Sequence, residues 1–427
     1  MIKSKIFIIG GLTFMLVNFG FAQDKLTITE AYRLAENNFP LLRSIDIYQA
    51  IAEMEDQLID QKRKPVISIH SEATLQSEAV SIGTEIPNSP ISIDVPLYRA
   101  QAYGKISYSL YDGGVSEIQK HINDLQTQVK QQEILIDAYP LKAQVNQLFF
   151  GILLGQNLTK LYQITESDLQ ARKEILQSGV QYGTVLESEV TKIAVRLMEL
   201  ENEKRKVAAD INSGYATLSV LLGKNVAPNT ELVIDIEERF LTSTKLNRPE
   251  SALYEKQRVS VRAQKELIDR MDKPQIILFG QAGLAYPNRL NFSKIELAPF
   301  ALGGIGLSYK LSDKSDKSIK KQKLILHENL IDIREETFEH QLEVQKSGYA
   351  EKFQSLNYQI DQYEKIAELQ AEILSQLQIQ LDNGVITSTD YLIQANAELL
   401  ARQNLELTKV RLKQKELEYF NIIGQKN

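Results

Sequence analysis

The sequence contains none of the arrangements of side chains that commonly carry enzyme chemistry. It contains no cysteine, which excludes disulfides, thiolate metal sites and cysteine catalysis. Neither a Gly-x-Ser-x-Gly nucleophile motif nor a glycine-rich phosphate-binding loop is present. No two histidines are three or four residues apart, the spacing at which a helix could offer both to one metal; the four are His70, His121, His327 and His340. We therefore expect no catalytic residues, no metal site and no cofactor.

The sequence contains an internal duplication. At an offset of 201 residues, an aspartate, a turn glycine and a terminal glycine recur without a gap. At an offset of 209, two proline-containing motifs recur nearer the start of each copy. Two registers held over such lengths indicate that one structural unit occurs twice. The matched residues are Asp112 with Asp313, Gly183 with Gly384, Gly223 with Gly424, Pro40 with Pro249, and Pro65 with Pro274.

Each copy ends in a predicted hairpin of two long helices. In the second copy the mostly apolar positions alternate four and three apart, which is the seam of a helix that packs lengthwise against a neighbour. Proline is absent from residues 312–427, so we expect this arm to run unbroken for about 100 Å to the turn at Asn383-Gly384. Pro140 lies within the first arm and predicts a kink near residues 137–140, in that arm only. The seam positions are Leu356, Ile360, Tyr363, Ala367, Gln370, Leu374, Leu377 and Leu381.

Before each hairpin, apolar and polar residues alternate with the period of a half-buried strand. The strands are expected at about residues 65–77, 98–111, 275–285 and 299–311. A loop rich in proline, glycine and serine separates the first two. A closed barrel needs about eight or more strands, and open sheet edges promote association. Four strands per chain therefore indicate that several chains combine.

The beginning of the chain predicts export. Lys3 and Lys5 precede an apolar run over residues 6–19, and small residues follow it before Gln23. We divide the chain into a signal peptide, a first repeat, a linker and a second repeat: residues 1–22; 23–223, with its helical hairpin at 113–223; 224–248; and 249–427, with its hairpin at 314–424. Without the signal peptide the chain has 47 basic and 55 acidic residues, which disfavours nucleic acid as a partner.

With these features in view, the chain resembles the TolC family of outer-membrane efflux channels over essentially all of its mature length. Three features carry the resemblance: an opening motif, a strand-to-helix junction, and two hairpins that each end in glycine. They read Thr29-Glu30-Ala31-Tyr32-Arg33-Leu34-Ala35-Glu36-Asn37-Asn38-Phe39-Pro40, Leu110-Tyr111-Asp112-Gly113-Gly114, and Leu222-Gly223 with Ile423-Gly424. The order and duplication of these motifs are more specific than any one of them.

This resemblance implies a fold, an assembly and a function. The fold would be mainly α with a transmembrane β part: duplicated long helical hairpins forming an α-barrel, plus four strands per chain contributing to a trimeric 12-stranded β-barrel. The homotrimer would lie in the outer membrane lipid with its helices in the periplasm. It would serve a tripartite efflux or type I secretion system as a passive exit duct, docking to a periplasmic adaptor and, through it, to an inner-membrane transporter.

If the strands lie in the membrane, the hairpin turns form the far periplasmic tip. We expect the adaptor to contact the two turns there, where apolar residues at an exposed turn favour a partner surface. The alternative interpretation is that the glycines only provide positive φ and that the apolar residues pack inward. The tip residues are Tyr182, Gly183, Thr184, Val185, Asn383, Gly384, Val385 and Ile386.

The resemblance also implies rings of acidic residues that narrow the channel at this tip. Asp390 matches one such position, and Glu189 is its equivalent in the first hairpin. A ring of carboxylates around an aqueous passage would bind cations and repel anions. Acids in the first turn of a helix are also ordinary caps, so the two interpretations remain open. The match is incomplete, because a second acidic position is Ile393 here, and latching Arg and Tyr residues are replaced by Ile386 and Leu381.

A second class of function shares the long hairpins. A periplasmic coiled-coil adaptor or scaffold protein would also contain them. Such a protein would need a compact lipoyl-like or barrel domain in place of two well-separated pairs of strands. It would also be extracted with soluble or inner-membrane material. The two strand pairs therefore favour the channel.

Overall fold

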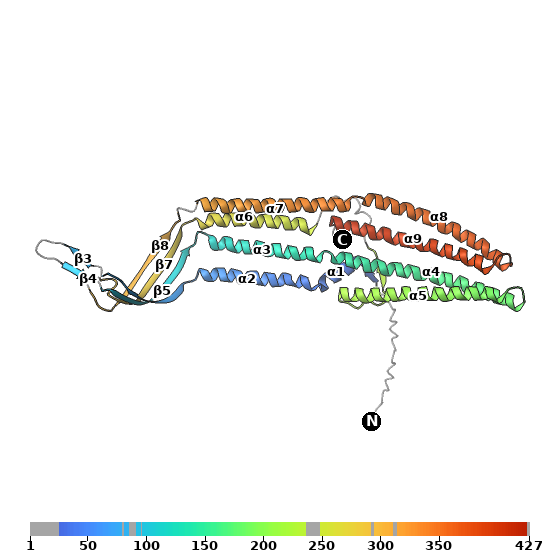
Figure 1. The fold of residues 1–427 in the computed structure, drawn as a ribbon, viewed down its shortest axis with the longest axis horizontal. Helices are drawn as coiled ribbons and strands as arrows, with labels where there is room; N and C mark the ends of the chain where they lie inside the picture. The colour runs from blue at the N-terminus through green and yellow to red at the C-terminus, as the bar shows by residue number, and fades with distance from the viewer. Residues whose placement is uncertain are drawn as a thin grey trace, which may run out of the picture.

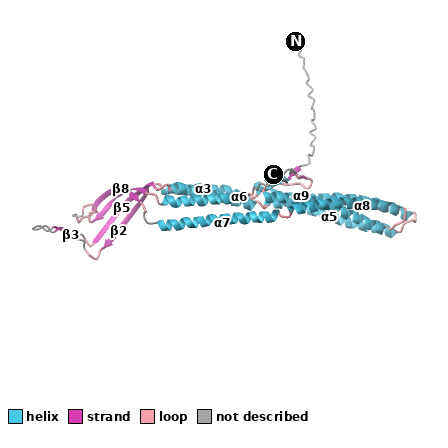
Figure 2. Cartoon of the chain, turned by 90° about the horizontal axis from the view of Figure 1, so that it is seen from above, coloured by secondary structure: helices cyan, strands magenta, loops and turns pink. Residues whose placement is uncertain are grey.

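The computed structural model describes residues 25–78, 81–84, 91–94, 96–235, 248–291, 294–310 and 314–424. The predicted signal peptide, residues 1–22, lies outside the described residues. The described chain is a long rod with a sheet at one end and helical arms along the rest of its length (Figure 1). Seen from above, the arms remain side by side and the sheet stays confined to its end (Figure 2).

The main sheet has four antiparallel strands in the order β2-β5-β7-β8. These are β2 (Val66–Leu75), β5 (Tyr98–Tyr111), β7 (Gln275–Tyr286) and β8 (Ala298–Ser308), close to the four expected positions. The first repeat supplies β2 and β5, the second supplies β7 and β8, and the β5–β7 pair joins the two copies. Within the described ranges, β2 and β8 pair on one side only, so both edges of the sheet are open.

Two short strand pairs lie outside this sheet. A hairpin of β3 (Ser81–Thr84) and β4 (Ile91–Asp94) occupies the segment that was predicted to be a loop. At mid-length, β1 (Lys25–Thr27) pairs in parallel with β6 (Glu231–Val233), which lies in the predicted linker. This second pair ties the first described residues to the connection between the repeats.

The helices next to the sheet form one layer in the order α2-α3-α6-α7. Their bounds are α2 (Ser44–Lys62), α3 (Val115–Ala138), α6 (Pro249–Met271) and α7 (Lys314–Lys346). The step from β5 into α3 is set by Asp112, whose carboxylate accepts hydrogen bonds from the backbone N–H groups of Gly114 (3.0 Å) and Ser116 (2.9 Å). Gly113 has a φ of +79° and lies against the Arg270 carbonyl, where a side chain would collide.

The distal half consists of two hairpins that pack against each other. These are α4 (Leu141–Gln181) with α5 (Glu187–Leu222), and α8 (Tyr349–Asp382) with α9 (Ser388–Ile423); α4 and α9 make the main contact between them. An apolar cluster drawn from all four helices fills the interior and includes Leu169, Ile193, Leu381 and Tyr391. At mid-length, the short α1 (Ile28–Asn38) packs on α4 and α5, and the 3-10 turn η1 (Pro40–Arg43) that follows it contacts α2 and α3.

The predicted kink is confirmed in the first arm, but its restriction to that arm is wrong. α3 ends at Ala138 and α4 begins at Leu141, on either side of Tyr139 and Pro140. The second arm, which was expected to run unbroken, is also interrupted: α7 ends at Lys346 and α8 begins at Tyr349. The cause is Gly348, whose φ of +82° is left-handed and incompatible with a continuous helix.

No helix among the described residues combines the length and the hydropathy that crossing a membrane would require.

Candidate functional site

The two hairpin turns at the distal tip have the same backbone structure. Gly183 and Gly384 adopt φ values of +73° and +69°. The backbone N–H of Thr184 donates to the carbonyl of Gly179 (2.9 Å), and that of Val385 donates to the carbonyl of Gln380 (2.8 Å). Both pairs differ by the same 201 residues as the sequence repeat. Both helices therefore end in the same glycine-containing turn.

The predicted tip residues fall into two groups by exposure. Tyr182 (84% exposed) and Val385 (70%) project from the turns, and Leu186, which the sequence analysis did not single out, is 72% exposed. Val185 and Ile386 are half-buried and pack against the apolar cluster of the four helices. The exposed apolar surface thus consists of one or two side chains from each turn.

Asp390 is part of a capping box at the start of α9. The Thr387 side chain accepts from the backbone N–H of Asp390 (3.4 Å), and the Asp390 carboxylate accepts from the Thr387 backbone N–H (3.1 Å) and hydroxyl (2.7 Å). These hydrogen bonds lower the pKa of Asp390 below its ordinary value, with the Thr387 side chain as the main cause. The side chain remains exposed, so its negative charge is also available to solvent.

Glu189 occupies the equivalent position but makes different contacts. One carboxylate oxygen pairs with Lys192 (2.8 Å), and the other accepts from the backbone N–H of Ser388 (2.7 Å), the first residue of α9. The hydrogen bond from Lys192, followed by that from Ser388, lowers the pKa of Glu189 below its ordinary value. An acid of the first hairpin therefore caps a helix of the second, a contact the sequence analysis missed because 199 residues separate the partners.

Further polar contacts join the two hairpins near the tip. Arg172 of α4 donates to both carboxylate oxygens of Asp382 in α8 (2.7 and 2.6 Å), and its side chain is largely buried. Arg196 of α5 donates to the amide oxygen of Asn396 in α9 (2.8 Å). These contacts hold the two turns in one relative position.

Leu381, Ile386 and Ile393 occupy the three positions at which the resemblance implied acidic or latching residues that this chain lacks. Leu381 is buried at 5% exposure within the cluster of the four helices, and Ile386 packs against the same cluster. Ile393 is 65% exposed on α9. The contacts that hold this tip are therefore apolar packing together with the Glu189 and Arg172 hydrogen bonds.

At the opposite end, the sheet has one apolar and one polar face. Strand registers place the residues of each face side by side across all four strands. The strand residues of the first face carry no charge, and its side chains are largely exposed: Ile67, Ile69, Leu75, Ala102, Ile106, Ala282, Leu284, Ala301, Ile305 and Leu307. The second face, called the polar face below, is polar mainly on β2 and β5, while β7 and β8 add Gln281 among mostly apolar residues. Its polar residues are Ser68, His70, Glu72, Arg99, Gln101, Lys105, Ser107 and Gln281, and its apolar ones include Ile277, Phe279, Phe300 and Leu302.

The outer helices of the layer each carry an exposed apolar stripe. The stripe on α2 is Ile47, Ile51, Met54 and Leu58, and the stripe on α7 is Ile319, Leu326, Leu330 and Ile333. Their spacing of three, four and seven residues puts each set on one side of its helix. Among the helices that the structure describes in this layer, α2 packs beside α3 and α7 beside α6, so each has an open flank.

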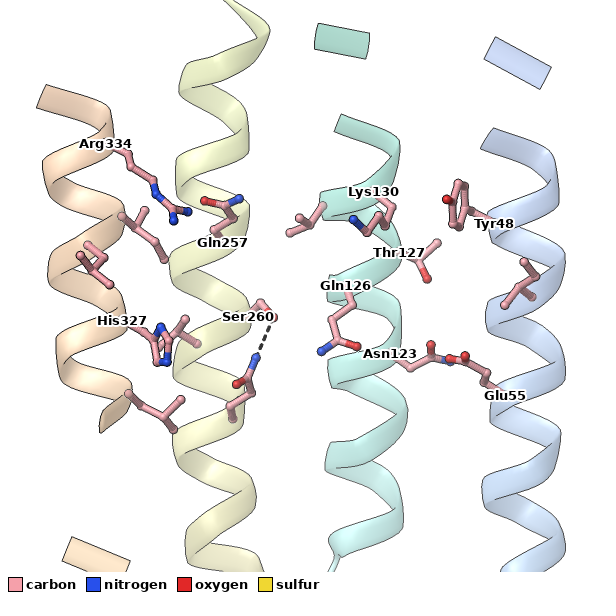
Figure 3. Close-up of a pocket in the computed structure, with 17 residues that line it drawn as sticks. Tyr48, Glu55, Asn123, Gln126, Thr127, Lys130, Gln257, Ser260, His327 and Arg334 are labelled. Carbon is pink, nitrogen blue, oxygen red and sulfur yellow. Dashed lines mark hydrogen bonds between the residues drawn. The ribbon is translucent and has the colours of Figure 1, made fainter. Parts of the chain in front are cut away.

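A hollow of about 560 Å³ lies along the middle of this layer. Figure 3 shows that its labelled polar side chains come from all four helices, with Tyr48 and Glu55 on α2, Lys130 on α3, and His327 and Arg334 on α7. Across the described ranges, no three His, Asp or Glu side chains gather as a metal site would require. The hollow mixes side chains of both charges with apolar ones.

No protein-family model and no curated protein matches the sequence. Several solved structures nevertheless share its fold. They include the Campylobacter jejuni CmeC outer membrane channel (12% identity, 93% of this chain and 85% of that chain, TM-score 0.61). A second is the outer membrane protein VceC of Vibrio cholerae (12% identity, 93% of this chain and 96% of that chain, TM-score 0.61). A third is the open state of the Neisseria gonorrhoeae MtrE outer membrane channel (12% identity, 93% of this chain and 88% of that chain, TM-score 0.61).

These likenesses confirm the fold class expected from the resemblance to the TolC family. The chain is mainly α, with duplicated long helical hairpins and a β part of four main strands. The similarity covers nearly the whole length of each of these channels. It therefore extends to both the helical arms and the sheet.

Proposed function

We propose that three copies of this chain form a channel in the outer membrane. The observation that carries the proposal is the two-faced sheet with two open edges. Three chains would bring together 12 strands, which removes every open edge if the ring closes. The apolar face would then contact lipid and the polar face would line a water-filled lumen, as in membrane barrels.

The helical layer supports the same ring. α2 leads directly into the edge strand β2, and the edge strand β8 is followed in the chain by α7. The open helix flanks therefore lie on the same two sides of the molecule as the open sheet edges (Figure 1). If the α7 stripe of one chain packs on the α2 stripe of the next, both edges are satisfied by one head-to-tail contact that can close into a ring.

The helical part would lie in the periplasm and serve as a passive exit duct. In this arrangement the tip turns lie at the opposite end of the rod from the membrane (Figure 1). The exposed side chains of Tyr182 and Val385 then form the surface to which a periplasmic adaptor docks, and through it an inner-membrane transporter. Such a duct would serve a tripartite efflux or type I secretion system. CmeC and MtrE, which share the fold, are described as outer membrane channels.

We keep Asp390 as the candidate gate ring and assign Glu189 a different role. The exposed carboxylate of Asp390 is free to face a narrow aqueous passage in a trimer. The carboxylate of Glu189 is occupied by Lys192 and the Ser388 N–H, which suits a fastening contact between hairpins. Opening of the tip would require that contact to break.

Membrane fractionation and conductance together test the proposal. The expressed protein should fractionate with the outer membrane and resist extraction by salt, and the purified protein should produce discrete ion-conducting steps in a planar lipid bilayer. A protein that salt removes from the membrane, and that produces no current, would contradict the channel. Recovery in the inner-membrane fraction would favour the adaptor class.

A further inference from the structure

An aromatic row crosses the polar face of the sheet. The strand registers place His70, Tyr103, Gly283 and Phe300 next to one another on β2, β5, β7 and β8. The rings of His70 and Tyr103 stack, with centroids 5.2 Å apart, and those of Tyr103 and Phe300 are 6.0 Å apart. A side chain at Gly283 would collide with Tyr103, so the absence of a Cβ there allows the Tyr103 and Phe300 rings to approach each other.

Arg289 lies on this row. It belongs to the connection between β7 and β8, at the end of the sheet away from the helices. Its guanidinium carbon is 4.9 Å from the centre of the Phe300 ring and 5.6 Å from that of Tyr103, within the range of a cation–π contact. The Arg289 side chain therefore lies over the polar face at its outer end.

A chain of hydrogen bonds fixes the position of Arg289. Its guanidinium donates to the Gln101 amide oxygen (3.2 Å), and the Gln101 amide nitrogen donates to the Glu72 carboxylate (2.8 Å). The turn before it is held by Asn288, whose side-chain oxygen accepts from the backbone N–H groups of Leu290 and Asn291 (both 3.0 Å). Glu72 is therefore linked to Arg289 only through Gln101. Among the described residues, no carboxylate pairs directly with Arg289.

The polar face is positively charged overall. Its charged strand residues are Arg99 and Lys105 against Glu72, and Arg289 adds a third cation at the outer end. A guanidinium has five donors in a planar fork, and one of them is used by Gln101. The remaining donors are available to an oxyanion, which the fork can bind through two hydrogen bonds.

We propose that Arg289, seated on Tyr103 and Phe300, forms an anion-binding ring at the outer mouth of the channel that favours cargo bearing carboxylate or phosphate groups. The inference rests on the proposed function, because three copies of the cluster must face one lumen. There, three guanidinium groups would raise the local concentration of anions and lower that of cations. The aromatic row holds each guanidinium in place without neutralising its charge.

Reversal potentials in a potassium chloride gradient test this ring. We compare the full-length channel with Arg289→Gln, Arg289→Lys and, as a matched loss of charge away from the sheet, Arg33→Gln on the exposed surface of α1. Arg289→Gln should lower the chloride-to-potassium permeability ratio by about twofold, because one lumen cation per chain is lost. Arg289→Lys and Arg33→Gln should match the parent channel.

Inorganic phosphate serves as the probe for oxyanion binding. Added on the outer side, it should reduce single-channel current in the parent channel and have a weaker effect on both Arg289→Gln and Arg289→Lys, since lysine keeps the charge but lacks the fork. If all variants conduct with the same reversal potential and the same response to phosphate, the ring is refuted and the channel stands. If the parent protein yields no current, the proposed function itself fails.

Discussion

The carboxylate of Glu189, in the first turn of α5, accepts a hydrogen bond from the backbone N–H of Ser388 at the start of α9 (2.7 Å). Lys192 holds the same carboxylate in place through its other oxygen. An acid of one repeat therefore satisfies a free backbone donor of the other, at the end of the rod opposite the sheet. This contact couples the two hairpin tips, and any movement of one turn away from the other must break it.

Replacing Glu189 should loosen the start of α9. We expect Glu189→Ala to cost about 1 kcal/mol locally, as the loss of a helix cap does. Amide hydrogen exchange at residues 388–392 should accelerate about fivefold, because a loss of about 1 kcal/mol raises the population of the open state by that factor. Glu187→Ala removes an exposed acid from the same turn of α5 and is the control. Equal protection in the two variants would show that the Glu189 contact does not hold the tip.

The tip should also loosen at acidic pH. The pKa of Glu189 is lowered from its ordinary value of 4.5, so the stabilisation is complete above 4.5 and is lost as the pH falls through the lowered pKa. Hydrogen exchange of the 388–392 amides, corrected for its intrinsic pH dependence, should show reduced protection in that acidic window. Glu189→Ala should show a smaller change, because protonation of Asp390, whose pKa is also lowered, loosens the same cap in this window. If Glu189→Ala retains the full loss of protection at acidic pH, a group other than Glu189 causes it.

A pair of substitutions separates the charge of Asp390 from its capping role. Asparagine can still accept the hydrogen bonds from Thr387, whereas alanine cannot. If Asp390 lines the aperture, Asp390→Asn should weaken the block of single-channel current by multivalent cations while the start of α9 remains ordered. Asp390→Ala should weaken the cation block and also disorder the start of α9. Unchanged block in Asp390→Asn would leave Asp390 as a helix cap alone.

Gly348 should be required for the break between α7 and α8. Its φ of +82° is strained for any residue with a Cβ, although no atom lies close enough to collide, so Gly348→Ala should destabilise the protein by about 1 kcal/mol. Gly151 lies inside α4 with open space beside it, and Gly151→Ala should instead stabilise by about 0.5–1 kcal/mol. Denaturant titrations compare the two. Equal effects would mean that the positive φ at Gly348 is not maintained.

The elements with a strong local signal were predictable from the sequence. Alternation on both copies located the four main strands, and Pro140 located the break in the first arm. Gly348 was missed because a lone glycine inside a helical pattern does not by itself end a helix, and the backbone conformation that ends it is not visible in sequence. The β3–β4 hairpin was missed because its short strands lie in a segment rich in proline and serine.

The site was less predictable than the fold. The duplication identified both turns and placed Glu189 and Asp390 at equivalent positions. The structure gives the two acids different partners. Glu189 pairs with Lys192, three residues later, and with the backbone at the start of α9, whereas Asp390 bonds to Thr387 within its own turn. Which acid meets which partner depends on packing between the hairpins, which spacing within one helix cannot reveal.

The mass of the assembly in detergent tests the central claim most directly. Native mass spectrometry should give three copies for the parent protein. A glutamate in the apolar stripe of α2 should prevent the ring from closing, so Met54→Glu should yield mainly single chains with unchanged helix content, whereas Met54→Leu should retain three copies. A parent protein that is a stable single chain, with its sheet edges and helix flanks open as in Figure 1, would contradict the account.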